Sequence, residues 1–177
     1  MIQKAVIMDE NAMKRAVARI SYEIIERNKG TNDLCIIGVM SRGVHIAQRI
    51  ADKLYELEGK RPDVGVLDIT AFRDDKKHIP DSDSTNIPFD VRNKRVILVD
   101  DVIYTGRSSR AAIDAIMNRG RPQNIQLAVL IDRGHRELPM RADYIGKNVP
   151  TSKEEEVKVM VTELDGCDKV IIAEQEE

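Results

Sequence analysis

Aromatic side chains are scarce in this chain and tryptophan is absent: Phe, Trp and Tyr together make up 3% of its 177 residues. A platform of aromatic rings on which successive bases stack is therefore not expected. An excess of one charge is also lacking, because 28 Lys and Arg residues face 30 Asp and Glu residues, which gives a formal net charge of −2. This balance indicates no general affinity for nucleic acid, although a local basic face is compatible with it.

Long apolar runs and paired cysteines are lacking as well. No apolar run approaches the ~20 residues that a membrane-spanning helix needs, and the start of the chain has no signal-peptide pattern. The two cysteines, Cys35 and Cys167, lie far apart in the sequence and give neither a disulfide framework nor a metal-binding spacing. We therefore expect a protein of the reducing cytoplasm that does not engage a membrane.

What is present is an alternation of helical and strand-like segments. The expected elements are a helix at residues 9–28, a strand at 34–39, a helix from 44 to about 59, strands at 64–69 and from 96, a helix at 107–118, a strand at 125–131, and strand-like segments at 157–161 and 170–173. Asp9 is expected to cap the first helix and Gly30 to stop it. Strands that alternate with helices in a single domain, residues 1–177, indicate a doubly wound, mostly parallel α/β sheet.

Polar turns follow three of the expected strands, after Val39, Val99 and Ile131. The carboxyl ends of parallel strands meet at one edge of a sheet, and sheets of this kind bind their ligands there. The three turns are therefore expected to converge on one site.

The most informative stretch is residues 94–109, KRVILVDDVIYTGRSS. An apolar strand is expected to end at two acids, Asp100 and Asp101, whose burial costs several kcal/mol unless they are paired. Ribose hydroxyls can donate hydrogen bonds to such carboxylates, and a hydrated divalent cation can neutralise them. The alternative is a pair of surface acids at a sheet edge or helix cap, but the turn that follows favours a ligand site.

That turn has the composition of a phosphate-binding loop. Gly106 allows the backbone to approach a phosphate closely, and Arg107 adds a positive charge. Hydroxyl groups come from Thr105, Ser108 and Ser109. Ser108 can also serve as a helix N-cap, and the two roles are compatible. A Walker-type loop is excluded, because the pattern G-x-x-x-x-G-K-[ST] does not occur, so the stretch favours a sugar phosphate.

Residues 74–90 are dense in Asp, Ser, Lys and Pro and show no periodicity. One interpretation is a solvated surface loop. The other is a lid over an active site, because structureless loops of this length are often functional.

The segment VILVDDVIYTGRSS resembles the phosphoribosyl pyrophosphate (PRPP) signature of the type I phosphoribosyltransferases. The first helix, VMSRGVHIA and IQLAVLIDRGHRELPMRADYIGKNVPTS together resemble the pyrimidine operon attenuation regulators, bifunctional proteins that also act as uracil phosphoribosyltransferases. The resemblance covers nearly the whole chain and is weakest at residues 74–90 and after Glu155. It implies a type I phosphoribosyltransferase-like α/β fold with a mostly parallel sheet flanked by helices, a small hood and a flexible loop at about residues 73–90.

The resemblance also implies roles for individual residues. It assigns catalysis to Asp100, Asp101, Arg42 and Arg73. It assigns PRPP or UMP binding to Ser41, Arg42, Asp100, Asp101, Val102, Ile103, Tyr104, Thr105, Gly106, Arg107, Ser108 and Ser109. It assigns base binding to Tyr144, Ile145 and Asp132, and it implies an unusual cis peptide bond in the turn of Ser41 and Arg42. Mg²⁺ is expected to bind through substrate oxygens and water near the two acids, with no direct protein ligand.

The implied reaction converts uracil and PRPP into UMP and diphosphate. Two departures from the purine-salvage relatives favour a pyrimidine: Tyr104 stands where those relatives carry an Asp, and their Lys near the position of Asp132 is missing. No general base for the uracil N1 proton is identified. For Tyr144, which the resemblance places against the base, composition alone favours a packed aromatic in a strand.

The second implied activity is binding of the hairpin in pyrimidine operon leader mRNA, with UMP or UTP as nucleotide ligands. The candidate residues are Arg15, Arg19, Tyr22, Arg141, Lys147 and Lys153, and the first three share one stripe of the first helix. A homodimer or higher homo-oligomer is expected to join the two groups into a concave basic patch. The alternative is ordinary solvated charge, with Arg19 paired to Glu23.

Three functions therefore remain open from the sequence. The first is an enzyme that also regulates through RNA. The second is a salvage phosphoribosyltransferase without RNA function. The third is an RNA-binding nucleotide sensor with vestigial catalysis.

Overall fold

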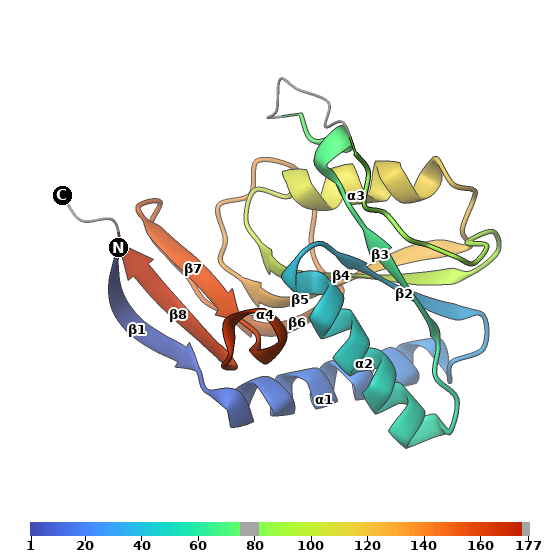
Figure 1. The fold of residues 1–177 in the computed structure, drawn as a ribbon, viewed down its shortest axis with the longest axis horizontal. Helices are drawn as coiled ribbons and strands as arrows, with labels where there is room; N and C mark the ends of the chain where they lie inside the picture. Colours follow the sequence, from blue (N-terminus) through green and yellow to red (C-terminus); the bar gives the residue numbers. More distant parts are fainter. Residues whose placement is uncertain (75–81, 175–177) are drawn as a thin grey trace.

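In the computed structural model, which describes residues 1–74 and 82–174, the chain forms a five-stranded and a three-stranded sheet (Figure 1). The larger sheet has the strand order β3-β2-β4-β5-β6, and all of its pairs are parallel. Its strands are β3 (Asp63–Leu67), β2 (Leu34–Val39), β4 (Arg95–Ile103), β5 (Asn124–Asp132) and β6 (Tyr144–Asn148). The predicted mostly parallel α/β sheet is confirmed.

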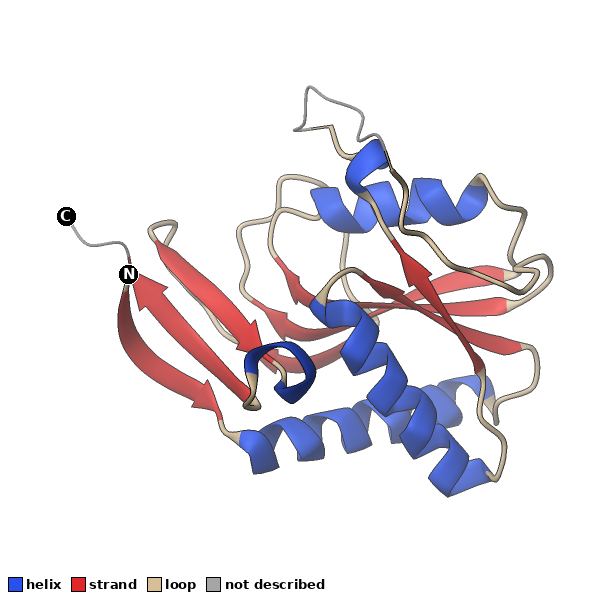
Figure 2. Cartoon of the chain, in the orientation of Figure 1, coloured by secondary structure: helices blue, strands red, loops and turns tan. Residues whose placement is uncertain are grey.

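Helices cover both faces of this sheet. Helices α1 (Glu10–Asn28) and α2 (Arg42–Glu58) lie on one face, and α3 (Arg107–Met117) lies on the other (Figure 2). Successive residues of β2 alternate between the two layers: Ile36 joins the core under α1 and α2, whereas Ile37 joins the core under α3. Because β2 is buried on both faces, its sequence is a continuous apolar run instead of an alternating one.

A small antiparallel sheet of order β1-β8-β7 forms a hood beside the main sheet (Figure 1). Its strands are β1 (Ile2–Met8), β7 (Glu155–Met160) and β8 (Lys169–Glu174), and a short helix, α4 (Thr162–Asp165), precedes β8. The predicted strand-like segments near residues 157 and 170 are confirmed, but β1 was missed. Most of β1 is exposed or half-buried, and Ile2 is 59% exposed, so its sequence gives no buried apolar pattern.

Most helix boundaries lie where the sequence placed them. The Asp9 carboxylate accepts the Ala12 N–H at 2.8 Å at the start of α1, as an N-cap should. The left-handed residue that ends α1 is Lys29, one position before the predicted stop at Gly30. The N-cap predicted at Ser108 is wrong, because α3 begins at Arg107 and Gly106 precedes it.

Two other segments differ from the prediction. Strand β4 does not end at the acid pair but continues through it to Ile103, because its pairing with β5 persists to that residue. Residues 75–81 of the predicted loop lie outside the described residues. The segment from 82 to 90 has no regular element and most of its residues are exposed, but Asn86 bridges to Val66 and Ile87 is 4% exposed, so this part of the predicted loop is anchored on β3.

Within residues 1–74 and 82–174, the helices are too short or too polar to span a membrane.

The start of α2 packs directly on β4, and Gly43 makes this possible. A Cβ atom at Gly43 would lie 2.7 Å from the Val99 carbonyl oxygen and 3.2 Å from the Asp100 Cα atom. Only a residue without a side chain fits this approach. The polar turn after β2 is therefore held against the acidic part of β4.

We expect Gly43→Ala to lower the free energy of unfolding by about 1–3 kcal/mol, because the added methyl group overlaps backbone that cannot move aside locally. Urea unfolding followed by circular dichroism measures this loss. Gly59→Ala is the control: nothing lies within 4 Å of its Cβ position, and the added methyl group meets only the strain of a left-handed backbone (φ +75°), which Gly43 does not share. If Gly43→Ala alters ligand binding at the acids no more than Gly59→Ala does, the proposed close approach has no role in shaping the site.

Candidate functional site

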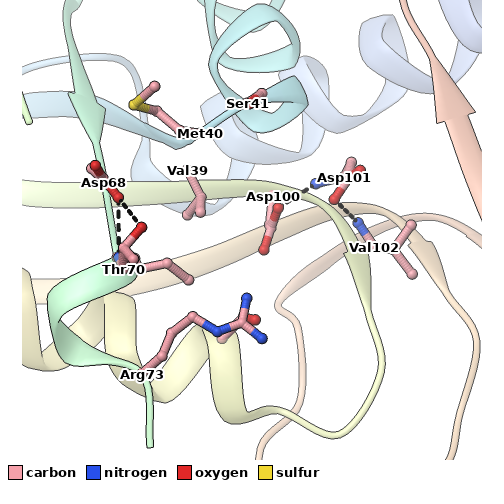
Figure 3. Close-up of a pocket in the computed structure, with 11 residues that line it drawn as sticks. Val39, Met40, Ser41, Asp68, Thr70, Arg73, Asp100, Asp101 and Val102 are labelled. Carbon is pink, nitrogen blue, oxygen red and sulfur yellow. Dashed lines mark hydrogen bonds between the residues drawn. The ribbon is translucent and has the colours of Figure 1, made fainter. Parts of the chain in front are cut away.

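The carboxyl ends of β2, β3 and β4 surround a cavity of about 440 Å³. Polar residues line it from the turn after β2, the segment after β3, the end of β4 and the start of α3: Ser41, Asp68, Thr70, Arg73, Asp100, Asp101 and Ser108. All of these except Ser108 are labelled in Figure 3. Two of the three predicted polar turns thus meet here. Asp68 and Thr70 were not predicted; they follow β3, and a polar residue after a buried strand is the signal that could have found them.

The turn after β2 contains a cis peptide bond between Met40 and Ser41. The resemblance implied such a bond in the turn of Ser41 and Arg42, and the structure has it immediately before Ser41. Both Met40 and Ser41 line the cavity.

The two acids face the cavity side by side at the far end of β4. The Asp100 carboxylate accepts the Asp101 N–H at 2.8 Å, and the Asp101 carboxylate accepts the Val102 N–H at 2.8 Å. Burial, together with the neighbouring Asp101, raises the pKa of Asp100 well above its usual range, and Arg73 opposes this shift. Figure 3 shows the Arg73 guanidinium extending from the turn after β3 toward Asp100. The site therefore holds a carboxyl group that ionises reluctantly.

A second cavity, of about 280 Å³, continues from the first along residues 102–109, and Arg73 lines both. Its wall is the turn before α3, in which Gly106 has φ +91° and the Thr105 hydroxyl accepts the Arg107 N–H at 3.2 Å. The Thr105 carbonyl accepts hydrogen bonds from the N–H groups of Glu137 and Leu138. The predicted phosphate turn is thus a fixed loop at the N-terminus of an 11-residue helix, which favours an anion.

Two arginines that the sequence assigned to the site contact acids of the protein instead. Arg42 makes a bidentate ion pair with Asp165 of the hood, with its Nη2 atom 2.7 Å from Oδ1 and its Nε atom 3.2 Å from Oδ2. Arg107 contacts Asp74 at 2.6 Å and Glu137 at 3.0 Å. Neither guanidinium extends unpaired into the cavity in this conformation. The partners of both arginines are distant in sequence, so no local pattern announced them.

The predicted stacking of Tyr144 on a base is wrong for this structure. The side chain is 3% exposed and lies in the core under α1, and its phenol donates a hydrogen bond to Gln126 at 2.5 Å. Burial raises the pKa of this phenol. A ring enclosed by the core cannot stack on a ligand, so the alternative interpretation, a packed aromatic in a strand, is confirmed.

The other two residues predicted to bind the base are differently placed. Ile145 is half-buried on β6. Asp132, at the end of β5, accepts hydrogen bonds from Arg136 at 2.5 Å and from the Gly134 N–H at 3.0 Å. Burial acts to raise the pKa of Asp132, but these two contacts lower it overall, so the group is a carboxylate at neutral pH.

Two side chains of the third polar turn, residues 132–136, contact Tyr104, and the sequence did not single them out. The Arg133 guanidinium lies over the ring of Tyr104, with 4.0 Å between its Cζ atom and the ring centroid. The His135 ring meets Tyr104 edge-on, with 5.9 Å between centroids. The sequence marked this turn as polar, but the role of the two residues follows only from their contact with Tyr104, which is distant in sequence.

The residues predicted to bind RNA lie on the surface near α1 and β6. Arg15, Tyr22, Arg141, Lys147 and Lys153 are exposed, and Tyr22 is 56% exposed. Arg19 instead joins the two elements: its guanidinium donates to the carbonyl oxygens of Ile145 and Gly146 and contacts Glu23 at 3.3 Å. The predicted pairing of Arg19 with Glu23 is confirmed. A shallow hollow of about 440 Å³ beside Arg19 is lined by Glu23, Arg27, Arg141, Ala142, Asp143 and Ile145.

Comparison with known proteins matches residues 5–164 to the phosphoribosyl transferase domain family. Three relatives, each named bifunctional protein PyrR, are similar along their whole length. The relative from Pelotomaculum thermopropionicum is 57% identical, over 99% of this chain and 98% of its own. Those from Listeria welshimeri and Enterococcus faecalis are 52% and 55% identical, over 100% and 98% of this chain and 100% and 99% of their own.

Solved structures share the fold at low sequence identity. A hypoxanthine phosphoribosyltransferase of Trypanosoma cruzi superimposes with a TM-score of 0.76 at 14% identity and covers 98% of both chains. One from Staphylococcus aureus gives a TM-score of 0.65 at 15% identity, over 86% of this chain and 80% of that chain. At such identities the likeness supports the fold alone.

We expect the ionisation of Asp100 to destabilise the fold progressively as the pH rises. Its pKa is raised above the unfolded value, so its contribution to stability is fully present below about pH 4 and is lost as the pH rises through the folded pKa. Asp100→Asn cannot ionise, and its advantage in free energy of unfolding over the unmodified chain should therefore grow from pH 4.5 to pH 8. Urea unfolding across this range measures the difference.

Asp168→Asn serves as the control of opposite sign. Burial acts to raise the pKa of Asp168, but the hydrogen bonds from Arg49 and Thr162 lower it overall, so this substitution should cost most stability at neutral pH and least in acid. An Asp100→Asn difference that stays constant with pH would contradict the raised pKa.

Proposed function

Because the chain belongs to the phosphoribosyl transferase domain family, and within it to the bifunctional PyrR proteins, we propose that the cavity at the ends of β2, β3 and β4 is its transferase site. The chain is a bifunctional regulator of pyrimidine genes with uracil phosphoribosyltransferase activity. The assignment of each part of the substrates to this cavity, given below, is the proposal.

We assign three parts of the site to the three parts of PRPP. The ribose hydroxyls donate hydrogen bonds to Asp100 and Asp101. The 5′-phosphate lies in the turn of residues 105–109, at the N-terminus of α3. The diphosphate lies at the turn that begins with the Met40–Ser41 peptide, where Arg42 reaches it after leaving Asp165. Arg73, which lines both cavities, lies between the two phosphate positions.

The single observation that supports this assignment most is the acid pair. An ionised Asp100 beside Asp101 in a desolvated site is unfavourable without donors, and its raised pKa reports this. A diol supplies hydrogen-bond donors to both carboxylates at once. A ligand with ribose hydroxyls thus relieves the unfavourable ionisation, whereas a ligand without them does not.

The reaction breaks the bond between C1 of the ribose and the diphosphate oxygen and forms a bond from C1 to N1 of uracil, which loses its proton. The contribution of the protein is to align the two reactants and to hold charge, and Arg42 and Arg73 are positioned to stabilise the departing diphosphate. Tyr104 occupies the end of the cavity beyond the acids, and its ring favours a pyrimidine over the purines that related transferases accept.

The cavity offers Mg²⁺ the carboxylate oxygens of Asp100 and Asp101, whereas the Asp68 carboxylate already accepts hydrogen bonds from Thr70 and Ser84. Among residues 1–74 and 82–174, however, His, Cys, Asp and Glu side chains form no group of three or more that could hold a metal ion. We therefore assign Mg²⁺ to the substrate oxygens and to water near Asp100 and Asp101. When bound, it neutralises the diphosphate.

Incubation with uracil, PRPP and Mg²⁺ should yield UMP and diphosphate, and hypoxanthine should yield no nucleotide. Asp100→Asn and Asp101→Asn should each lower kcat/KM by about 10²–10³, because each removes a charged acceptor from the ribose. Chromatography of the products measures both. Asp90→Asn is the control, since this exposed acid pairs only with Arg92 in the described structure and should leave the rate within about twofold. PRPP binding without UMP formation would reduce the site to a sensor.

The regulatory activity requires a second surface, and we propose the face shared by α1 and β6 for leader mRNA. Arg19 fixes α1 against β6, so the exposed Arg15 and Tyr22 stand on the same side as Arg141 and Lys147. Arg19 itself contributes by holding α1 against β6, because its donors are engaged by main-chain carbonyls of β6. A homodimer or higher homo-oligomer extends this face by repeating it.

RNA affinity should fall steeply between 50 and 200 mM salt, because phosphate contacts release counterions. Arg15→Gln and Arg141→Gln should each weaken binding of a leader hairpin and reduce the slope of log affinity against log salt by about 1. Filter binding with and without UMP measures both quantities. Arg92→Gln, on the opposite side of the sheet near α3, is the matched control, and Asp100→Asn should leave RNA affinity largely intact. An affinity that does not change with salt would contradict the proposed face.

A further inference from the structure

The ring of Tyr104 is held from two sides by residues that follow β5. The Arg133 guanidinium lies over one face of the ring at 4.0 Å, close enough for a favourable cation–π contact. The His135 ring approaches edge-on, with an interplanar angle of 71°. The main chain of Tyr104 is fixed as well, because its carbonyl accepts a hydrogen bond from Arg136 at 2.9 Å. Both the ring and the main chain of Tyr104 are therefore held in place.

Arg133 is a buried cation, and its bonding is unusual. The residue is 7% exposed, yet among residues 1–74 and 82–174 it forms no ion pair. Its guanidinium instead donates to the Thr151 hydroxyl at 3.1 Å and to the carbonyl oxygens of Ser152 at 3.1 Å and Glu155 at 2.6 Å. Burial of a guanidinium costs several kcal/mol, which these acceptors, the Tyr104 ring and the nearby Glu155 carboxylate offset together. The pKa of Glu155 is lowered by its hydrogen bond from Lys4 and, to a smaller extent, by the charge of Arg133.

The hydrogen-bond acceptors of Arg133 all lie in one short segment, residues 151–155, and the same segment accepts a hydrogen bond from His135. The His135 Nε2–H donates to the Thr151 carbonyl at 2.5 Å, and the Thr151 hydroxyl donates back to the Arg133 carbonyl at 3.2 Å. Thr151 thus anchors both side chains that contact the Tyr104 ring. Residues 151–155 lead directly into β7 of the hood, so the position of Tyr104 is set by the base of the hood.

Tyr104 stands between the two acids and the phosphate turn, and it lines the smaller cavity. The acids and the turn on either side of it are assigned to the ribose and the 5′-phosphate. The ring must therefore lie near C1 of the ribose, where the incoming base attacks. A displacement of the ring by one rotamer would change the space left for that base.

We propose that Arg133 is the positioning residue for the pyrimidine base: it holds the Tyr104 ring in place as the wall of the base site. This inference rests on the transferase function proposed above. Arg133 does not touch the substrate; it acts through Tyr104. The planar, forked guanidinium is required, because it must donate to the 151–155 segment in its own plane while its face covers the ring. A lysine, which has a single ammonium group, cannot do both.

Arg133→Met tests the proposal, because methionine fills much of the same volume without donors or charge. We expect KM for uracil to rise at least tenfold while KM for PRPP stays within about twofold. Arg133→Lys should give a similar rise, since the charge alone does not restore the geometry.

A double-mutant cycle separates positioning from a general loss of structure. Tyr104→Leu removes the wall, so in that background Arg133→Met should raise KM for uracil no further. Thermal unfolding of each variant is measured in parallel. If Arg133→Met lowers the melting temperature but leaves KM for uracil unchanged, or if the two substitutions act independently, Arg133 is only structural and the proposal fails.

Thr151→Val provides the same test if Arg133→Met does not fold. It removes the hydroxyl that accepts from Arg133 and keeps the guanidinium, and it should raise KM for uracil selectively by about threefold or more; an unchanged value contradicts the proposal. The unmodified chain is the reference in every assay. Absence of UMP from the unmodified chain refutes the proposed function, whereas an active chain whose KM for uracil is insensitive to these substitutions refutes this inference alone.

Discussion

The burial of Asp100 against the start of α2 is the constraint on which the rest of the site depends. Strand β4 lies in the middle of the parallel sheet, and its pairing with β5 continues past the acids. The missing side chain of Gly43 lets the first turn of α2 rest on the strand at this point. Asp100 is thereby partly desolvated, and the turn after β2 is placed beside the two acids. This close backbone approach thus brings the proposed ribose and diphosphate positions together. It also makes ionisation of Asp100 unfavourable unless a ligand donates hydrogen bonds to it.

Apolar side chains of the hood share a core with α1 and α2, and three arginines add polar contacts between the hood and the rest of the chain; two of these arginines also belong to or contact the substrate loops. Arg49 makes ion pairs with Asp168 and Glu163 and serves attachment alone. Arg42 stands at the diphosphate turn and reaches Asp165, whereas Arg133 stands behind Tyr104 and reaches the segment before β7. The hood and the cavity therefore share side chains, although the hood contributes none of the residues that line the larger cavity.

The sequence predicted what depends on local pattern. Apolar runs located β2, β3, β4 and β5 of the main sheet but not β6. Asp9 located the start of α1, and the composition of residues 94–109 located the acids and the proposed phosphate turn. Prediction from the sequence failed where a partner distant in the chain determines the structure. The β5 strand extends β4 beyond the acids, and the packing of α1 encloses Tyr144. The contacts of Arg42 with Asp165, and of Arg133 with Tyr104, join residues that no periodicity connects.

Because of the ion pair between Arg42 and Asp165, the arginine that we propose to bind the diphosphate already has an anion of the protein as its partner. PRPP must displace this internal counterion to recruit Arg42, whereas UMP, which has no diphosphate, can occupy the ribose and phosphate positions without disturbing it. The two ligands would fill the same cavity, but the Arg42–Asp165 contact to the hood would be broken with PRPP and kept with UMP. A protein that regulates genes as well as making UMP has in this one contact a physical means of distinguishing its sugar-phosphate substrate from its nucleotide product.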